Sequence, residues 1–299
     1  MPDIEIGAET TPDDVALGET GPPDVAVEVT GFETVADAVA DASVADASID
    51  DASVDVPPSD TVPSDIPVAD LPKFSFFVTS IESMQRLSGS PDGFGGDLRF
   101  GEATGLAGAD KICTTIADTE LPGAGAKRWH AYLSAVDDGQ GNNVHAIERI
   151  GTGPWYDRNG RLVAADLPGL RSTRPAGDAT LKDDLPNERG EGQKSQPGPG
   201  AQGTADNHDV LTASNSAGLL DTALKANTCQ DWTDASTSGR PRLGHSWPAM
   251  SGQGWAAAHP AAGCAAVVNI LQNGPGAQDC KGVGCGGGYG AIYCFAEVP

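Results

Sequence analysis

Six cysteines and five histidines are the residues of this chain whose types could do chemistry. Three of the cysteines, Cys280, Cys285 and Cys294, lie in one glycine-rich segment, CKGVGCGGGYGAIYC, near the end of the 299 residues. Thiolates at such spacing can hold a metal ion, act as nucleophiles or form disulfides. The segment therefore admits three chemistries, and the rest of the chain has to decide between them.

Disulfides are favoured over metal binding and catalysis at these cysteines. Tetrahedral zinc usually takes its ligands from two paired knuckles, and the convenient fourth ligands, Cys264 and His259, do not form a second knuckle. A catalytic cysteine needs a free thiol beside a histidine base, but nothing marks one cysteine as free, and an even number can all pair. We expect three disulfides and no metal site.

The motifs of other enzyme classes are missing. No G-x-S-x-G motif occurs, and in LGHSWP, residues 243–248, the histidine and serine are neighbours whose side chains would point apart in a strand. The glycine runs GFGGD and CGGGYG lack the lysine and the strand-to-helix setting of a phosphate-binding loop. The sequence therefore predicts that the protein is not an enzyme. The alternative is a metal-assisted hydrolase whose site lies in the long loops.

The oxygen-rich segment AVDDGQGNN, residues 135–143, is the candidate for a calcium site. Its candidate ligands are Asp137, Asp138 and Asn142, because hard cations bind carboxylate and amide oxygens. The segment does not have the glycine and glutamate positions of the twelve-residue calcium loop. A solvated turn is therefore favoured, and no cofactor is expected, with calcium as the alternative.

A ligand-binding loop is predicted from the tryptophans. Most of the five tryptophans of a domain this size should lie in the core. The segment HSWPAMSGQGW differs, because its glycine, serine and proline residues indicate a surface loop. It predicts His245, Trp247 and Trp255 as ligand-binding residues, with a tryptophan exposed for stacking on a sugar.

Charge is distributed unevenly along the chain. Residues 1–72 contain 18 of the 42 acidic residues, no lysine or arginine and one aromatic residue, so their formal charge is −18. The remaining residues hold 18 basic and 24 acidic side chains, a formal charge of −6. High charge with little apolar surface cannot offset the entropy of ordering a backbone. We therefore predict a disordered acidic tether over residues 1–72 and one folded domain over residues 73–299.

The same patterns exclude two kinds of partner. Nucleic-acid binding needs clustered lysine and arginine, which the weakly acidic domain lacks. No run of 18 apolar residues occurs, so no membrane span is predicted. The start, MPDIEIGAETTPDD, has neither the basic nor the apolar part of a signal peptide. Because disulfides persist only outside the reducing cytosol, we expect an export signal, with a lipid anchor, upstream of the given start.

The folded part is predicted to be α+β, with mostly antiparallel sheets and one main helix. Residues 103–120 form an apolar stripe at helical spacing, which places Cys113 on the buried face. Residues 153–164 predict a hairpin, because the pair Asn159–Gly160 favours a type I′ turn. Residues 168–206 show no periodicity and predict a long surface loop. Further strands are predicted at residues 74–80, 127–136, 209–214, 228–236, 264–272 and 289–296.

Six short segments occur in an order that resembles the endostatin-like domain. They are GLAGADKIC, RWHAYLS, GPWYDRNGRLVA, TCQDWT, GRPRLGHS and CGGGYGAIYCF. The resemblance covers about residues 74–297 and implies a C-type-lectin-like fold, which relatives in bacterial surface lipoproteins share. Neither the zinc ligands of endostatin nor the calcium motifs of sugar-binding C-type lectins have a counterpart here. The resemblance therefore implies a fold without implying a ligand.

The resemblance also implies which cysteines pair. Its first helix is linked to its last strand, and the three bonds it implies are Cys113–Cys294, Cys229–Cys285 and Cys264–Cys280. A rival scheme keeps the first bond and forms Cys229–Cys264 and Cys280–Cys285. Closing a loop of about 180 residues with the first bond would stabilise the domain by about 5 kcal/mol in the chain-entropy model.

These patterns together predict a noncatalytic binding module that acts outside the cytoplasm. The tether would hold the domain away from a surface, as in a cell-surface or secreted lipoprotein. A glycan or a protein at the cell surface is the expected partner. A purely structural surface protein is a further alternative.

Overall fold

The computed structural model describes residues 72–194, 196, 205–271 and 279–297. The predicted tether, residues 1–72, lies outside the described residues except for Pro72. In the described part, mixed strand pairings, a few helices and three disulfides form an α+β domain, as predicted. None of the described helices has the length and apolar character needed to cross a membrane.

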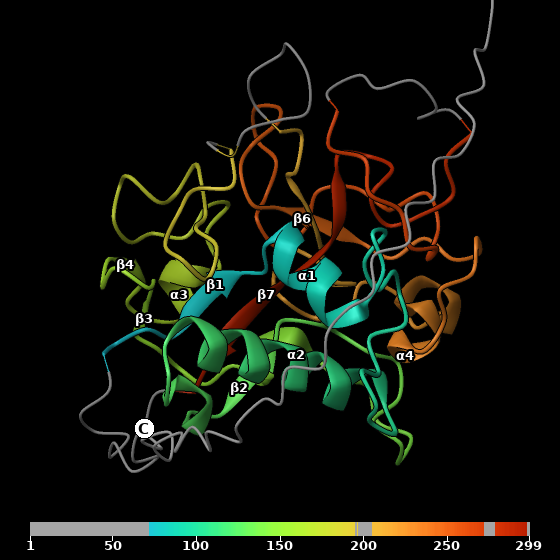
Figure 1. Cartoon of the computed structure of the whole chain (residues 1–299), viewed down its shortest axis with the longest axis horizontal. Helices are drawn as coiled ribbons and strands as arrows, with labels where there is room; N and C mark the ends of the chain where they lie inside the picture. The colour runs from blue at the N-terminus through green and yellow to red at the C-terminus, as the bar shows by residue number, and fades with distance from the viewer. Residues whose placement is uncertain (1–71, 195, 197–204, 272–278, 298–299) are drawn as a thin grey trace, which may run out of the picture. The chain divides into compact units, whose positions relative to one another are not determined.

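The main sheet is built around its last strand, β7 (Gly288–Ala296), which runs through the centre of Figure 1. The strand order is β1 (Phe76–Val78), β7, β5 (Asp209–Leu211) and β6 (Leu243–His245), and β2 (Trp129–Ala131) also pairs with β7. Strands β1 and β2 run antiparallel to β7, β5 runs parallel to it, and β6 is antiparallel to β5. Every residue of β7 is buried, which suits its run of aromatic and small apolar residues.

A second, two-stranded sheet confirms the predicted hairpin but not its turn. It consists of β3 (Trp155–Tyr156) and β4 (Leu162–Ala164). A type I′ turn needs two residues with positive φ, whereas in this loop only Gly160 has one, at 76°. The carboxylate of Asp157 accounts for the difference, because its Oδ1 atom accepts hydrogen bonds from two backbone N–H groups of the loop.

Helix α2 (Gly105–Glu120) is the main helix that the apolar spacing predicts. It begins after Thr104, whose side chain caps a backbone N–H group of the first turn. Its buried stripe includes Ile112, Cys113 and Ile116, and it packs on β2 and β7. The sequence therefore predicted both the helix and the side that it buries.

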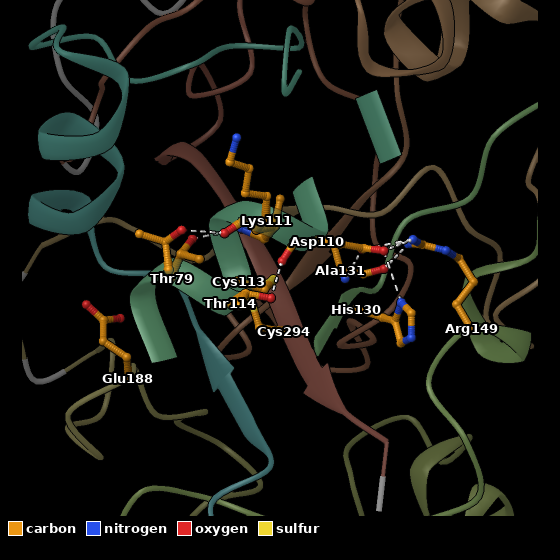
Figure 2. Close-up of a disulfide and its surroundings, with 12 residues drawn as sticks. Thr79, Asp110, Lys111, Cys113, Thr114, His130, Ala131, Arg149, Glu188 and Cys294 are labelled. Atoms are coloured by element: carbon orange, nitrogen blue, oxygen red, sulfur yellow. Dashed lines mark hydrogen bonds and ion pairs between the residues drawn. A yellow bond between two sulfur atoms is a disulfide. The ribbon is translucent and has the colours of Figure 1, made fainter. Parts of the chain in front are cut away.

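Asp110 ties helix α2 to strand β2 beside a disulfide (Figure 2). Its carboxylate accepts hydrogen bonds from the backbone N–H of Ala131 and from Nη2 of Arg149, both at 2.8 Å, and lies 3.0 Å from Nδ1 of His130. The Cys113–Cys294 bond lies one turn further along the helix. A charge-assisted cluster and a covalent bond thus hold the same helix against the sheet.

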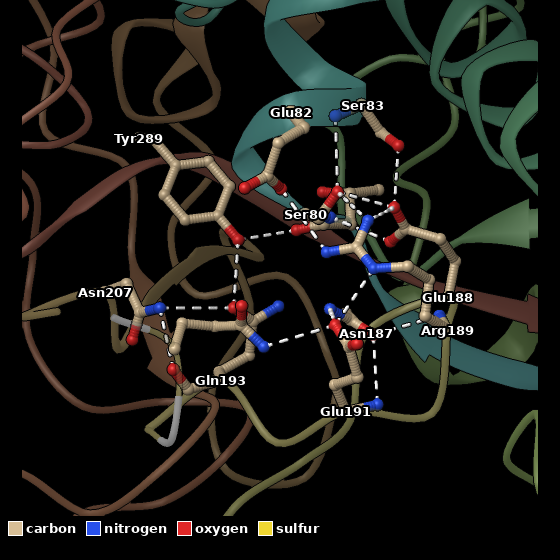
Figure 3. A network of polar contacts seen from close by, with 12 residues as sticks. Ser80, Glu82, Ser83, Asn187, Glu188, Arg189, Glu191, Gln193, Asn207 and Tyr289 are labelled. Atoms are coloured by element: carbon tan, nitrogen blue, oxygen red, sulfur yellow. Dashed lines mark hydrogen bonds and ion pairs between the residues drawn. The ribbon is translucent and has the colours of Figure 1, made fainter. Parts of the chain in front are cut away.

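Helix α1 (Ile81–Ser88) adds to the single main helix predicted. Its N-cap, Ser80, and its buried Ser83 both contact the buried carboxylate of Glu188 (Figure 3). Glu188 accepts from the backbone N–H of Ser80 (2.9 Å) and from the hydroxyls of Ser80 (2.5 Å) and Ser83 (2.6 Å). A carboxylate at a helix N-terminus is favourable, but this one comes from a residue 108 positions away from Ser80, which no local pattern reveals.

Two predicted strands are wrong. Residues 228–236 instead contain the short helical segment α4 (Cys229–Trp232), where Gln230 and Asp231 have left-handed backbone angles. In residues 264–271 only isolated residues pair, because the glycine-rich segment opposite them forms turns. The remaining helical elements are α3 (Leu167–Leu170) and the 3-10 turns η2 (Ala124–Ala126), η3 (Ala146–Glu148) and η4 (Lys225–Thr228).

The disulfides follow the rival pairing scheme. Cys113–Cys294 joins the first long helix to the last strand, as the resemblance implies. The other two bonds are Cys229–Cys264 and Cys280–Cys285, so the implied Cys229–Cys285 and Cys264–Cys280 bonds are wrong. The turns between Cys280 and Cys285 bring the Cα atoms of these two cysteines to 5.6 Å from each other, a separation that a disulfide can span.

The disulfides should differ in their contribution to stability. The double variant Cys113→Ser/Cys294→Ser removes a disulfide whose cysteines are 181 residues apart in the sequence. The double variant Cys280→Ser/Cys285→Ser removes a disulfide whose cysteines are 5 residues apart. The chain-entropy model predicts losses of about 5 and about 2 kcal/mol in the free energy of unfolding. Chemical denaturation monitored by tryptophan fluorescence measures both. Equal losses for the two variants would contradict this assignment of roles.

Candidate metal centre

Four side chains converge on one point between β5, β6 and β7. The Nε2 atoms of His208, His245 and His259 lie 3.4, 3.3 and 3.2 Å from the same carboxylate oxygen, Oδ1 of Asp209. The ligand atoms of all four residues lie within 4.8 Å of one another. Around a tetrahedral ion with bonds of about 2.0–2.1 Å, ligand atoms are about 3.3–3.4 Å apart. The spacing of Asp209 to each imidazole therefore fits a metal site.

The strand register brings Asp209 and His245 together. Asp209 is the first residue of β5, and its antiparallel partner is His245, the last residue of β6. Directly opposed residues of neighbouring strands project from the same face of a sheet. His208 directly precedes Asp209, and neighbouring residues of a regular strand point to opposite faces. The register between β5 and β7 shifts between Asp209 and Val210, so this alternation does not apply here, and the side chains of His208 and Asp209 can both reach the cluster.

His259 reaches the cluster on a segment that follows β6. The backbone N–H of Leu243 donates to the carbonyl of His259 (2.8 Å), and that of Ala258 donates to the carbonyl of Leu243 (2.7 Å). These bonds attach the segment to the free edge of β6. The fourth ligand is thus positioned by backbone hydrogen bonds rather than by sequence proximity.

The cluster is mostly buried, and two of its members, Asp209 and His245, lack hydrogen-bond partners among the described residues. The side chains of Asp209, His245 and His208 are 0, 1 and 7% exposed, whereas that of His259 is 35% exposed. Among the described residues, neither oxygen of Asp209 and neither ring nitrogen of His245 has a hydrogen-bond partner, because the close contacts between them lack hydrogen-bond geometry. Burying a carboxylate without partners is strongly unfavourable. A cation at the centre would satisfy Asp209 and His245 together.

Neighbouring acceptors fix the orientation of two of the imidazoles. Nδ1 of His208 lies 2.7 Å from Oδ1 of Asp206, and Nδ1 of His259 lies 3.2 Å from the carbonyl oxygen of Pro260. Each contact favours the form in which Nδ1 carries the proton and leaves Nε2 free to bind an ion. This arrangement of a carboxylate or carbonyl behind a histidine is typical of metal sites.

The local electrostatics favour a charged Asp209 and a neutral His245. Burial acts to raise the pKa of Asp209, but the contacts with His245 and His259 outweigh it, so the pKa lies below its ordinary value. Burial lowers the pKa of His245. Contact with Asp209 raises the pKa of the more exposed His259. An ionised carboxylate beside a neutral imidazole is the state that a cation requires.

The glycines of CGGGYG pass directly along this cluster. A Cβ atom on Gly286 would lie 2.4 Å from Oδ2 of Asp209, and one on Gly287 would lie 2.7 Å from Oδ1 of Asp206. Gly287 also has a φ of +120°, which side chains of L-residues rarely allow. The close approach of backbone to the candidate ligands therefore requires glycine at these positions.

A polar network supports the cluster from the side of His208. The ring of Trp247 packs edge-on against His208, with 5.0 Å between the ring centroids, and its Nε1 donates to Oδ1 of Asn207 (2.9 Å). Nδ2 of Asn207 donates to the carbonyl of Gln193 (2.8 Å), and the hydroxyl of Tyr289 lies 3.3 Å from Oε1 of Gln193 (Figure 3). The neighbours of the candidate ligands are therefore themselves held in place.

The predicted ligand-binding residues have other positions than expected. His245 belongs to the candidate metal cluster. Trp247 and Trp255 are only 7 and 1% exposed, so neither can offer a face to a sugar, although the loop between them is exposed at Met250. Tertiary packing overrides the composition of the loop, because both indole rings fill gaps beside the sheet. The prediction of an exposed tryptophan in this segment is wrong.

The predicted calcium ligands use their oxygens within their own loop. Oδ1 of Asp137 accepts from the backbone N–H groups of Gly139 and Gly141, and Oδ2 contacts Lys225. Oδ1 and Oδ2 of Asp138 likewise accept from the backbone of the loop and from Asn142. The structure thus describes a hydrogen-bonded turn at these residues.

Sequence reasoning predicted none of the four candidate metal ligands as part of a metal site. It assigned no role to His208 or Asp209, weighed His259 only as a partner of the cysteines, and placed His245 in a ligand-binding loop. The available signal was the pair His208–Asp209 at the start of a predicted strand. That pair alone cannot indicate a site, because the other ligands lie 36 and 50 residues beyond Asp209.

Comparisons with known proteins do not assign this cluster. No model of a known protein family matches the chain, and no curated protein is significantly similar to it in sequence. The function of the cluster therefore has to be argued from its own chemistry.

Proposed function

We propose that this protein is a noncatalytic binding module that works outside the cytoplasm and holds one zinc-like ion. The ligands would be His208, Asp209, His245 and His259. The observation that carries the proposal is the convergence of three imidazoles on a buried carboxylate that has no other partner. We further propose that the domain has the endostatin-like, C-type-lectin-like fold.

The ligand types favour zinc over calcium or magnesium. Imidazole nitrogen suits zinc and its neighbours in the first transition series, whereas calcium and magnesium prefer shells made of oxygen. Four protein ligands would complete a tetrahedral shell. Such a closed site stabilises a fold, whereas catalytic zinc keeps one position open for water.

The cellular setting follows from the crosslinks. Three disulfides indicate an oxidising compartment, because such bonds are rare in the cytosol. We propose that residues 1–72, with a formal charge of −18, display the domain at a cell surface, with a lipid anchor upstream. A glycan or a protein would be the partner there.

A metal-assisted hydrolase is the second candidate, and one observation favours it. The side chain of His259 is 35% exposed, so its departure from an ion would give water access to the metal. The burial of the other three ligands favours the closed, structural site. Both proposals share the metal centre. They differ in whether the ion has a coordination position that water can occupy.

Zinc binding is the first test of the proposal. The purified domain should bind one equivalent of Zn²⁺ in calorimetry, and Co²⁺ should show the strong visible absorption of tetrahedral sites. Asp209→Asn and His245→Ala should each weaken binding by more than about 100-fold, since even residues behind the ligands contribute about 10–100-fold. The control His130→Gln removes an imidazole outside the cluster and should leave the zinc affinity unchanged. If the native protein binds neither ion, the proposal is wrong.

Gly287→Ala tests the close approach of the backbone to the centre. The added methyl group would strain a φ of +120° and press on Asp206, so we expect a zinc affinity at least about tenfold lower. Gly139→Ala is the matched control, because that glycine also has positive φ but nothing within 4 Å of its Cβ position. Both variants should lose about 1–2 kcal/mol of stability from the backbone. Equal zinc affinities in the two would argue against a role for Gly287.

Hydrolysis of p-nitrophenyl acetate and of bis(p-nitrophenyl) phosphate distinguishes the two candidates. The zinc-loaded protein should hydrolyse neither substrate faster than Asp209→Asn does, because a complete shell leaves no position for a nucleophilic water. Zinc-dependent turnover that is lost in Asp209→Asn would support the hydrolase instead.

A further inference from the structure

A cavity of about 430 Å³ lies beside Trp255, outside the metal cluster. Three segments line it: residues 171–173 after helix α3, residues 216–217, and residues 252 and 254–257. The volume is within the range of small-molecule sites, about 300–1,000 Å³. Neither the metal centre nor the disulfides account for this cavity.

The walls of the cavity are held in a fixed shape. The indole Nε1 of Trp255 donates to the carbonyl of Leu170 (2.8 Å), and its backbone N–H donates to the carbonyl of Thr173 (3.1 Å). The hydroxyl of Tyr293 donates to the carbonyl of Trp255 (2.7 Å), and that of Thr212 donates to the carbonyl of Ala256 (2.8 Å). A preformed wall lowers the entropy lost when a ligand binds.

The side chains that line the cavity form an unused set of donors. Arg171, Ser172, Thr173 and Ser216 line it; all four are exposed, and no hydrogen bond or ion pair joins their side chains to a residue that the structure describes. The lining contains no carboxylate. One guanidinium and three hydroxyls therefore belong to a lining that has no carboxylate of its own, in a domain whose formal charge is −6.

Arg171 differs from the arginines that serve the fold. Arg149 and Arg161 pair with the carboxylates of Asp110 and Asp157. Arg171 has no such partner among the described residues, although its charge acts on the core residue Tyr132. Burial raises the pKa of Tyr132, and the charge of Arg171 opposes this rise. Arg171 is exposed, so its guanidinium is open to a ligand.

We propose that this cavity binds a small hydroxylated carboxylate. The carboxylate would pair with the guanidinium of Arg171, whose planar fork matches two carboxylate oxygens. The hydroxyls of Ser172, Thr173 and Ser216 would bind hydroxyl groups of the same ligand. This ligand class is assigned to the binding module proposed above and rests on that function, but it does not require the metal ion.

Calorimetric titration with D-glucuronate, D-gluconate and D-glucose tests the site. At least one of the two acids should bind with a Kd below about 1 mM, and neutral glucose should bind at least tenfold more weakly, because it cannot pair with Arg171. Glucuronate and gluconate distinguish a ring from an open chain as the preferred source of the carboxylate. If neither acid binds, or if glucose binds as well as they do, the proposal is overturned.

Substitutions locate the binding to this cavity. Arg171→Ala should weaken it at least tenfold, and Arg171→Lys should be intermediate because it keeps the charge but loses the fork. Ala217→Phe should also weaken it by filling the space while leaving Arg171 in place. The control Arg240→Ala removes an exposed arginine outside the cavity and should bind normally. Unchanged affinity in both Arg171→Ala and Ala217→Phe would overturn the assignment.

Zinc content measured in the same samples separates this proposal from the metal centre. A protein that retains zinc but binds neither acid contradicts the cavity assignment alone. A protein that binds an acid through Arg171 but holds no zinc contradicts the metal centre alone.

Discussion

The domain depends on the position of its last strand. Strand β7 pairs with β1, β2 and β5, so segments from the start and the middle of the domain meet only where the chain ends. Its tyrosine hydroxyls donate to the carbonyl groups of Thr79 and Trp255, at 2.6 and 2.7 Å, and Cys294 bonds helix α2. A strand buried along its whole length must satisfy its polar groups inside the protein. These contacts hold β7 in one register.

The metal centre follows from the same register. The glycines that lead into β7 allow its backbone to lie against Asp206 and Asp209, while β5 brings Asp209 opposite His245. The result is a carboxylate that no protein donor satisfies, which would be costly without a cation. A bound ion would offset this cost and link four ligands from distant parts of the chain. The ion would then crosslink the β5–β6 side of the domain, as the Cys113–Cys294 disulfide crosslinks helix α2 to β7.

The cavity and the metal centre share one piece of backbone. Gly254 and Trp255 line the cavity, and His259 is a candidate ligand of the centre. The segment between them is bound to β6 by hydrogen bonds from His245 to the carbonyl of Gly254 (3.1 Å) and from Leu243 to that of His259 (2.8 Å). An ion in the centre would therefore restrain a wall of the cavity. Such sharing is a physical basis for coupling between the two sites.

The sequence by itself determined the features that depend on neighbours along the chain. Apolar spacing in residues 103–120 predicted helix α2 with its buried cysteine, aromatic residues in 289–296 predicted β7, and the even number of cysteines predicted disulfides. Local preference failed at residues 228–236 and 264–272, where crosslinks and glycine turns decide the backbone. Only the tertiary structure decided how Cys229, Cys264, Cys280 and Cys285 pair and how the candidate metal centre is assembled. The reason is physical: its ligands have ordinary positions in the sequence, and they meet because strand register and a bulge turn them toward one point.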